Sequence, residues 1–293
     1  MGVEIDLLAN TASIPQCKVE KVLGYLREVK KAKGKRLRLS FWEELLGILN
    51  WISSVLVSGR FHLAQIVSAR RAASGHFGYA KVTAELEQEC QWWMSVVTKW
   101  NRVAIMLPPK HAPSPFHISD SLVTDAAGGA NGGGGGFFAG LWTAVWWSEE
   151  EVECLDIMEL EALMYCIFLK MVIDHDPTLL AGRRFVARND NQPWVASCNS
   201  NDSTKPAIAV LLAWLHELQA LYSFSVELEW IATDKNIIAD ALSRGEVRRF
   251  LQAAAHEGFP ESSLVRLQMP DRSSLVSKMM SAKCSKTKML PAQ

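Results

Sequence analysis

Four prolines fall within nine residues, from Leu107 to Pro115, and this stretch constrains the fold more than any other part of the sequence. Proline lacks a backbone N–H and fixes φ, so the stretch excludes regular structure and predicts a stiff linker over residues 107–116. Two domains of ordinary size are therefore expected, over residues 1–106 and 117–250. The remaining residues, 251–293, end in a polar, lysine-bearing segment and are predicted to form a disordered tail.

The first domain is predicted to be mainly helical. From Ser40 onward, and again over 84–100, apolar residues recur at the spacing of an amphipathic helix. The first of these stripes consists of Phe41, Leu45, Ile48, Leu49 and Ile52, and the second of Leu86, Cys90, Trp93, Val97 and Trp100.

Basic residues cluster near the start of the chain. Their total charge is offset elsewhere, since the formal net charge is +0, so any attraction to nucleic acid must be local. A phosphate backbone would suit this cluster, and a solvated helix face followed by a basic loop explains it equally well. The cluster contains Lys18, Lys21, Arg27, Lys30, Lys31, Lys33, Lys35, Arg36 and Arg38, opposed only by Glu20 and Glu28.

Composition indicates a globular protein of a reducing compartment. Apolar residues make up 49% of the chain, which is enough to bury a substantial core. The six cysteines occur singly, without the spacing of a zinc site or a disulfide framework, so an intracellular location in cytoplasm or nucleus is expected. The longest apolar stretch, Phe137 to Trp147, is too short to span a membrane, and no membrane partner is expected.

Strand and helix signals alternate in the second domain. The segments His117–Asp125 and Phe137–Trp147 are predicted to form a β-hairpin, with the glycine run Gly132–Gly136 as its flexible turn rather than a phosphate-binding loop. Strands interleaved with helices predict an α/β fold, a mixed sheet with flanking helices. The further elements expected are helices over 158–172, 205–222 and 236–244 and strands over 184–188 and 225–231.

Four acidic residues fall where such a fold could gather them, at strand ends and in helices: Asp125, Glu159, Asp190 and Asp240. Carboxylates that gather without basic partners repel one another, and bound divalent cations relieve this repulsion because hard Mg²⁺ prefers oxygen ligands. A two-metal site is one interpretation. Solvated surface acids are the other, and spacing alone leaves both open.

The words around these acids resemble the ribonuclease H domain of retroelement reverse transcriptases, particularly tyrosine-recombinase retrotransposons of the DIRS and Ngaro kind. Four words occur in the family's order, and the last is the most specific. They are Val123-Thr-Asp-Ala-Ala127, Leu155-Asp-Ile-Met-Glu-Leu-Glu-Ala162, Arg188-Asn-Asp-Asn191 and Asn236-Ile-Ile-Ala-Asp-Ala-Leu-Ser-Arg244. The resemblance implies a ribonuclease H-like fold and hydrolysis of the RNA strand of RNA–DNA hybrids.

The resemblance also implies a role for each acid. Asp125 would bridge two Mg²⁺ ions, with Mn²⁺ as an alternative, Glu159 and Asp190 would hold the ion nearer the leaving group, and Asp240 would assist the other. Two alternatives stay open, Asp120 in place of Asp125 and Glu161 in place of Glu159. Only one of the two glutamates can face the metals, because residues two apart on a helix point to different sides.

Two features depart from the family pattern. Asn189 stands where Thr or Ser commonly precedes the third aspartate, and no histidine lies between Ile231 and Asp240. A catalytically inactive nucleic-acid-binding remnant of a retroelement polyprotein is therefore the alternative function.

The resemblance extends upstream to the thumb and connection region of a reverse transcriptase. The words that carry it are Met1-Gly-Val-Glu-Ile-Asp6, Glu44-Leu-Leu-Gly-Ile-Leu-Asn-Trp51, Gly59-Arg60 and Gln91-Trp-Trp93. A thumb grips an RNA–DNA hybrid or primer–template duplex, which would make phosphate contacts of Lys30, Lys31, Lys33, Lys35, Arg36, Arg38 and Arg60. No Asp-Asp pair occurs in the sequence, so this chain is not expected to polymerise DNA, and a polymerase domain on another chain is a conceivable partner.

Overall fold

A computed structural model describes residues 2–8, 11–75, 77–100, 121–129, 132–181, 183–201, 203–222 and 224–287. The chain divides into two compact units, Met1–Leu107 and Pro108–Gln293. The predicted linker, residues 107–116, lies outside the described residues. No helix of the part described is long and apolar enough to cross a membrane.

The N-terminal unit is mainly helical. Its helices are α1 (Gln16–Lys31), α2 (Leu39–Ile52), the 3-10 helix η1 (Val57–His62), α3 (Ala64–Gly75) and α4 (Ala84–Trp100). Two short antiparallel ribbons accompany them, β1 (Glu4–Asp6) with β2 (Thr11–Ser13) and β3 (Arg36–Arg38) with β4 (Tyr79–Lys81). Both predicted amphipathic helices are present, and the stripe of α2, together with Leu86, Cys90, Trp93 and Val97 of α4, enters one apolar core.

Two words of the thumb-like resemblance meet inside this core. A Cβ on Gly59 would clash with the ring of Trp93, so only glycine fits there. The Trp93 indole N–H donates to the carbonyl oxygen of His62 at 2.5 Å, and the His62 ring stacks on Trp92. These contacts anchor η1, which carries Arg60, on α4.

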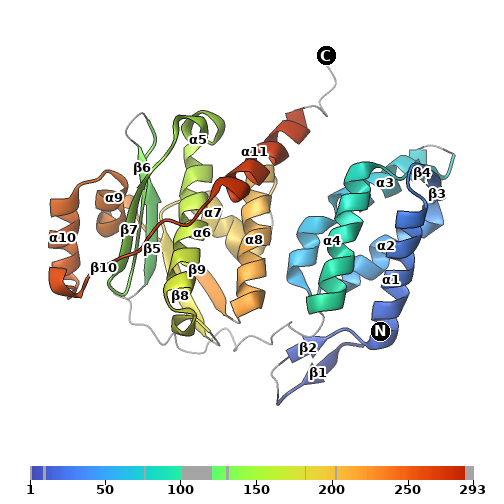
Figure 1. Cartoon of the computed structure of the whole chain (residues 1–293), viewed down its shortest axis with the longest axis horizontal. Helices are drawn as coiled ribbons and strands as arrows, with labels where there is room; N and C mark the ends of the chain where they lie inside the picture. The colour runs from blue at the N-terminus through green and yellow to red at the C-terminus, as the bar shows by residue number, and fades with distance from the viewer. Residues whose placement is uncertain are drawn as a thin grey trace. The chain divides into compact units, whose positions relative to one another are not determined.

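The C-terminal unit is a mixed six-stranded sheet with helices on both faces, as the ribonuclease H-like expectation requires (Figure 1). The strand order is β10-β7-β6-β5-β8-β9; β6 is antiparallel to β5 and β7, whereas the pairs β5–β8, β8–β9 and β10–β7 are parallel. The strands are β5 (Leu122–Ala126), β6 (Gly133–Phe138), β7 (Leu141–Trp146), β8 (Arg184–Asn189), β9 (Ser225–Trp230) and β10 (Val265–Arg266).

Helices cover this sheet in two layers (Figure 1). One layer contains α6 (Ile157–His175), α8 (Pro206–Tyr222) and α11 (Ser273–Thr287), and the other contains α9 (Ile237–Ser243) and α10 (Val247–His256). The remaining helices are α5 (Glu149–Cys154) and α7 (Gln192–Ser200), with the 3-10 helices η3 (Pro177–Leu179), η4 (Thr233–Lys235) and η5 (Glu261–Ser263).

The prediction of a flexible turn in the glycine run was wrong. Glycines 133 to 136 form most of the fully buried strand β6. Side chains alternate between the faces of a strand, and here a Cβ on Gly134 or Gly136 would strike α6, whereas one on Gly135 would strike α9. The glycines therefore let both helices approach the sheet closely. The predicted pairing was wrong too, because β5 pairs with β6, and the segment Phe137–Trp147 contains a turn of its own. That turn, Ala139-Gly140, joins β6 to β7, and both of its residues have positive φ, as a type I′ turn requires.

The prediction of a disordered tail over 251–293 was also wrong as far as residue 287. Strand β10 pairs with β7 at the edge of the sheet, and α11 packs against α8. Apolar residues hidden in the polar segment explain this order, because Leu267, Val276 and Met279 are buried. Residues 288–293 lie outside the described part of the chain.

Candidate active site

Asp125 lies near the end of the central strand β5 and is 6% exposed. The Ser243 hydroxyl on α9 donates a hydrogen bond to its Oδ2 at 2.5 Å. The pKa of Asp125 is raised, first by burial and further by the negative charges of Asp190 and Asp240, which together outweigh the Ser243 hydrogen bond. Three of the predicted acids thus share one electrostatic environment.

Asp190 follows directly after β8, which is parallel to β5. Amide side chains fix this strand end, since Asn189 Nδ2 donates to the carbonyl oxygen and hydroxyl of Thr124 at 3.3 and 3.1 Å. Asn236 Nδ2 donates to the same carbonyl at 3.0 Å and to Asp190 Oδ1 at 3.4 Å, and the Trp230 indole donates to the Asp190 carbonyl at 3.0 Å. Asn189, the departure from the family pattern, therefore holds together the two strands that carry Asp125 and Asp190.

Asp240 lies on α9 and is held by two arginines. Arg244 Nε and Arg249 Nη1 each donate to its carboxylate at 2.7 Å. Burial opposes ionisation of this carboxyl, but the two arginines outweigh it and lower its pKa. Asp240 is therefore a charged group with basic partners, unlike Asp125.

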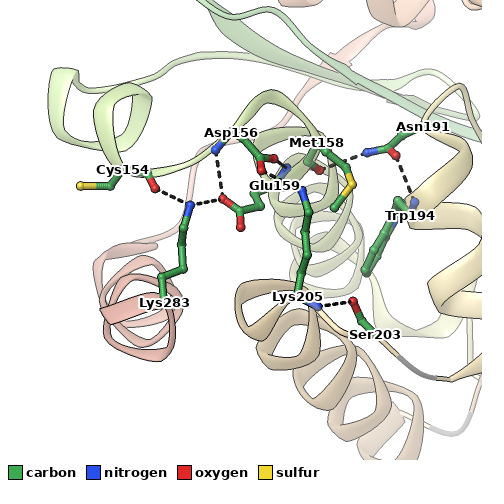
Figure 2. A network of polar contacts seen from close by, with 9 residues as sticks. All are labelled: Cys154, Asp156, Met158, Glu159, Asn191, Trp194, Ser203, Lys205 and Lys283. Carbon is green, nitrogen blue, oxygen red and sulfur yellow. Dashed lines mark hydrogen bonds and ion pairs between the residues drawn. The ribbon is translucent and has the colours of Figure 1, made fainter. Parts of the chain in front are cut away.

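Glu159 is turned toward a different set of partners, as Figure 2 shows. It is the third residue of α6 and forms a capping box with Asp156, in which each side chain accepts a hydrogen bond from the other residue's backbone N–H. Its Oε2 also pairs with Lys283 Nζ of α11 at 2.6 Å, and the same ammonium donates to the Cys154 carbonyl at 2.7 Å. The structure therefore assigns Glu159 to a helix cap and an ion pair, and the preference for it as a metal ligand is not met by the geometry.

Glu161 takes the place in the acidic cluster that the sequence analysis gave to Glu159. Its pKa is raised to about 8, first by burial and then by the charges of Asp190 and Asp125, against a lowering hydrogen bond with Asn191. Of the two glutamates left open as alternatives, Glu161 is the one whose carboxyl interacts with Asp190 and Asp125. The other alternative, Asp120, lies outside the described residues.

The four acids, Asp125, Glu161, Asp190 and Asp240, have donor chemistry that fits a hard divalent cation. Carboxylate oxygens are the ligands such ions prefer, and the buried Oδ1 of Asn236, beside Asp190, has no hydrogen-bond partner. Within the described ranges, however, no group of three or more acidic, histidine or cysteine side chains is already arranged around one ion position. Ion binding would therefore require side chains to reorient, above all Asp240, which is engaged by arginines.

The predicted nucleic-acid contacts lie on the N-terminal unit. All seven side chains are exposed, and of them Lys33 forms an ion pair with Glu87 at 2.8 Å. Lys30 and Lys31 end α1, Arg36 and Arg38 are in β3, and Arg60 is in η1. Exposure of this kind is compatible with phosphate contact and equally with a solvated face.

Several polar residues that position the acids were not among the residues predicted from the sequence. Ser243 and Asn236 belong to the last family word, so the signal was present but was used only to place Asp240. Asn191 lies in the third word; its side chain donates to the Met158 carbonyl and caps α7 (Figure 2). Arg249 lies beyond the family words and has no sequence signal.

Comparison with known proteins adds a distant structural likeness. No family model matches the chain, and no curated protein matches it. Among solved structures, the chain is similar to that of the foamy viral protease-reverse transcriptase dRH in complex with double-stranded DNA, at 14% identity and a TM-score of 0.30. The match covers 80% of this chain and 37% of that chain. Similarity at this level supports no inference about function.

Proposed function

We propose that this chain is a ribonuclease H-type endonuclease that hydrolyses the RNA strand of RNA–DNA hybrids by a two-metal mechanism. The observation that carries the proposal is the placement of Asp125 and Asp190 at the ends of the parallel strands β5 and β8, with Glu161 in the first turns of α6, which packs on β5. The charges that raise the pKa of Glu161 are all acidic, so the cluster is an arrangement of like charges. Like charges gathered in a buried place destabilise a fold unless a cation joins them, which is the physical reason to expect a metal site.

In this proposal Asp125, Glu161 and Asp190 are the first candidates to hold Mg²⁺ or Mn²⁺, and Asp240 joins them on release from its arginines. The ions, when bound, would supply an activated water and neutralise charge at the phosphorus. The chain's own residues have positioning tasks. Ser243 orients the Asp125 carboxylate, and Asn189 and Asn236 keep the ends of β5 and β8 together.

Recognition of the substrate is assigned to backbone contacts. The exposed lysines and arginines of the N-terminal unit would contact phosphates, which give affinity without base specificity. Preference for RNA would come from the 2′-hydroxyls and the shape of the hybrid. A primer–template duplex is the related substrate if a polymerase domain on another chain takes part.

The direct test is cleavage of a labelled RNA–DNA hybrid by the purified chain with Mg²⁺, alongside the Asp190→Asn variant. We expect the RNA strand to be cut, and we expect cutting to be lost in the variant. A double-stranded DNA of the same sequence is the substrate control and should remain intact. Absence of hybrid cleavage by the wild-type chain with either Mg²⁺ or Mn²⁺ would overturn the proposal.

A second candidate function is a nucleic-acid-binding remnant without catalysis. The ion pairs that hold Asp240 favour it, because a permanently paired carboxylate is not available to a metal. Thermal unfolding with and without Mg²⁺ discriminates the two functions. An enzyme site should be stabilised by about 2.7 kcal/mol at a metal concentration 100 times the dissociation constant, and Asp125→Asn should abolish the effect. The remnant predicts hybrid binding with no such stabilisation.

A further inference from the structure

A second site lies in the N-terminal unit, remote in sequence from the acidic cluster. A groove of about 620 Å³ opens between α1, α2, β3 and β4. This volume falls in the range of roughly 300–1,000 Å³ that is usual for small-ligand sites. Its lining includes the cationic side chains of Lys21, Arg36 and Arg38 and the aromatic side chains of Tyr25, Phe41 and Tyr79.

One wall of the groove is held in place by several contacts on Tyr25. Its phenol donates a hydrogen bond to Glu44, and this bond, followed by burial, raises the pKa of Tyr25. The ring lies 5.4 Å from that of the buried Phe41, between centroids, and Lys21 Nζ lies 5.9 Å from the Tyr25 ring centroid. This wall therefore offers a fixed aromatic surface and a cation together.

The opposite lining comes from the β3–β4 ribbon. Tyr79 is directly opposite Arg38 in the register and is 51% exposed, although it is a large aromatic residue. Arg36 lies two residues before Arg38 and so is on the same face of the strand. In the part of the chain that the structure describes, neither guanidinium is engaged in an ion pair, so both are available to an anion.

We infer that this groove binds an unpaired nucleotide of a single-stranded nucleic acid. Its base would stack on the Tyr79 ring, and Arg36 and Arg38 would contact the flanking phosphates, the combination of aromatic platform and basic track that single strands require. A base inside a duplex is already stacked and cannot enter such a groove. Lys30, Lys31 and Lys35 are exposed and precede Arg36 closely in the sequence, and further phosphate contacts by them would favour a continuous strand over a free nucleotide. The inference shares with the proposed function the premise that the chain binds nucleic acid, and both assign phosphate contacts to Arg36 and Arg38.

The test is equilibrium binding of a short labelled single strand to the full chain in EDTA, where cleavage cannot occur. We expect Tyr79→Ala to weaken binding roughly 5- to 150-fold, the loss of one stacked base, and Tyr79→Phe to retain it. Phe77→Ala is the matched control, because Phe77 is 100% exposed, lies two residues away and does not line the groove. Replacing Arg36 or Arg38 with alanine should reduce the slope of log affinity against log salt by about 0.7 each.

Four outcomes would overturn the inference. Equal effects of Tyr79→Ala and Phe77→Ala, or equal binding of an abasic strand, would reduce the groove to a basic surface. If Tyr79→Ala lost as much affinity for a blunt duplex as for the single strand, the groove would have no selectivity for unpaired bases. Competition by a nucleoside triphosphate at the affinity of the strand would make a free nucleotide the ligand. Because EDTA removes cleavage from the assay, each result is independent of whether the proposed nuclease is active.

Discussion

Two groups of carboxylates with little exposure to solvent lie in the α/β unit, and they differ in their partners. The cap carboxylates, Glu151 and Glu159, are 5% and 2% exposed, and they pair with Arg272 and Lys283 from the C-terminal segment. The site carboxylates, Asp125 and Glu161, have raised pKa values because burial is reinforced by other acids. Burial of an acid is thus no sign of chemistry by itself. The sign of the neighbouring charge distinguishes a structural acid from a candidate ligand.

The cations that pair with the cap carboxylates both come from the C-terminal segment. Arg272 donates to both carboxylate oxygens of Glu151 and to the Trp146 carbonyl, and α11 brings Lys283 to Glu159. Without these two cations, both cap carboxylates would be buried charges compensated only by the backbone N–H groups of their capping boxes. The segment is therefore part of the α/β unit, and it holds Glu159 away from the cluster that Glu161 joins.

The largest expected effect is on catalysis, and it compares one glutamate from each of the two groups. Glu161→Gln should lower hybrid cleavage by roughly 10³-fold, since a lost metal ligand removes several kcal/mol of transition-state stabilisation. Glu159→Gln is the matched control, two residues away on the same helix, and its cleavage rate should stay within about tenfold of the wild type. Single-turnover cleavage measures both. The reverse ranking would return the catalytic role to Glu159.

The same pair shows what the sequence could and could not predict. The local words placed Asp125, Asp190 and Asp240 on the correct strand ends and helix, because these positions depend on short-range patterns. The choice between Glu159 and Glu161 has one local signal, the capping-box spacing of Asp156 and Glu159, which was not used. It also depends on Lys283, more than a hundred residues further on, which no local pattern contains.

The prediction for the glycine run was wrong for a related reason. Glycine weakens a strand and favours turns in isolation, so the run resembled a loop. Only the close approach of α6 and α9 on the two faces of β6 makes these glycines necessary. Tertiary packing, which the periodicity of one segment does not record, decided the structure here.

Removal of the cation from a cap carboxylate should give the largest stability effect. Arg272→Ala leaves Glu151 buried and unpaired, and the free energy of unfolding should fall by about 3–5 kcal/mol. Chemical denaturation followed by circular dichroism measures it. Adding Glu151→Gln to Arg272→Ala should restore much of the loss, because the uncompensated charge is then gone. A double variant no more stable than Arg272→Ala would show that the arginine acts through packing alone.

A packing change at β6 should affect the site carboxylates and leave the cap carboxylates in place. Gly135 pairs with Asp125 across the β5–β6 ladder, and a Cβ there would meet Leu242 Cβ at 2.5 Å and the Ala239 carbonyl oxygen at 2.6 Å. Gly135→Ala should destabilise the fold by about 1–3 kcal/mol and displace α9, which carries Asp240 and Ser243.

A control for this substitution is Gly47→Ala, in the helix α2, where an added Cβ has no neighbour within 4 Å. It should raise stability by about 0.5–1 kcal/mol, since alanine is the better helix former. Thermal unfolding compares the two variants. Equal effects would mean that β6 and α9 tolerate separation and that the glycines are not required by close packing.

The last prediction concerns the direction of an effect, because the two groups of acids should differ in the sign of their pH dependence. Glu161 has an ordinary pKa of 4.5 and a folded pKa of about 8, so its contribution to stability is complete below 4.5 and is lost as the pH rises through 8. Glu151 behaves oppositely: burial opposes its ionisation, but Arg272 outweighs burial and lowers its pKa, so its contribution is present above 4.5 and is lost on acidification. Denaturant unfolding of the wild type and Glu161→Gln should therefore diverge from about pH 5 to about pH 9, with the wild type losing stability relative to the variant. Mg²⁺ should reduce the divergence, because a bound cation favours the ionised carboxylate. If the difference in unfolding free energy between the wild type and Glu161→Gln stayed constant over this range, Glu161 would be an ordinary surface acid. The two groups of acids would then not differ in their electrostatic environment.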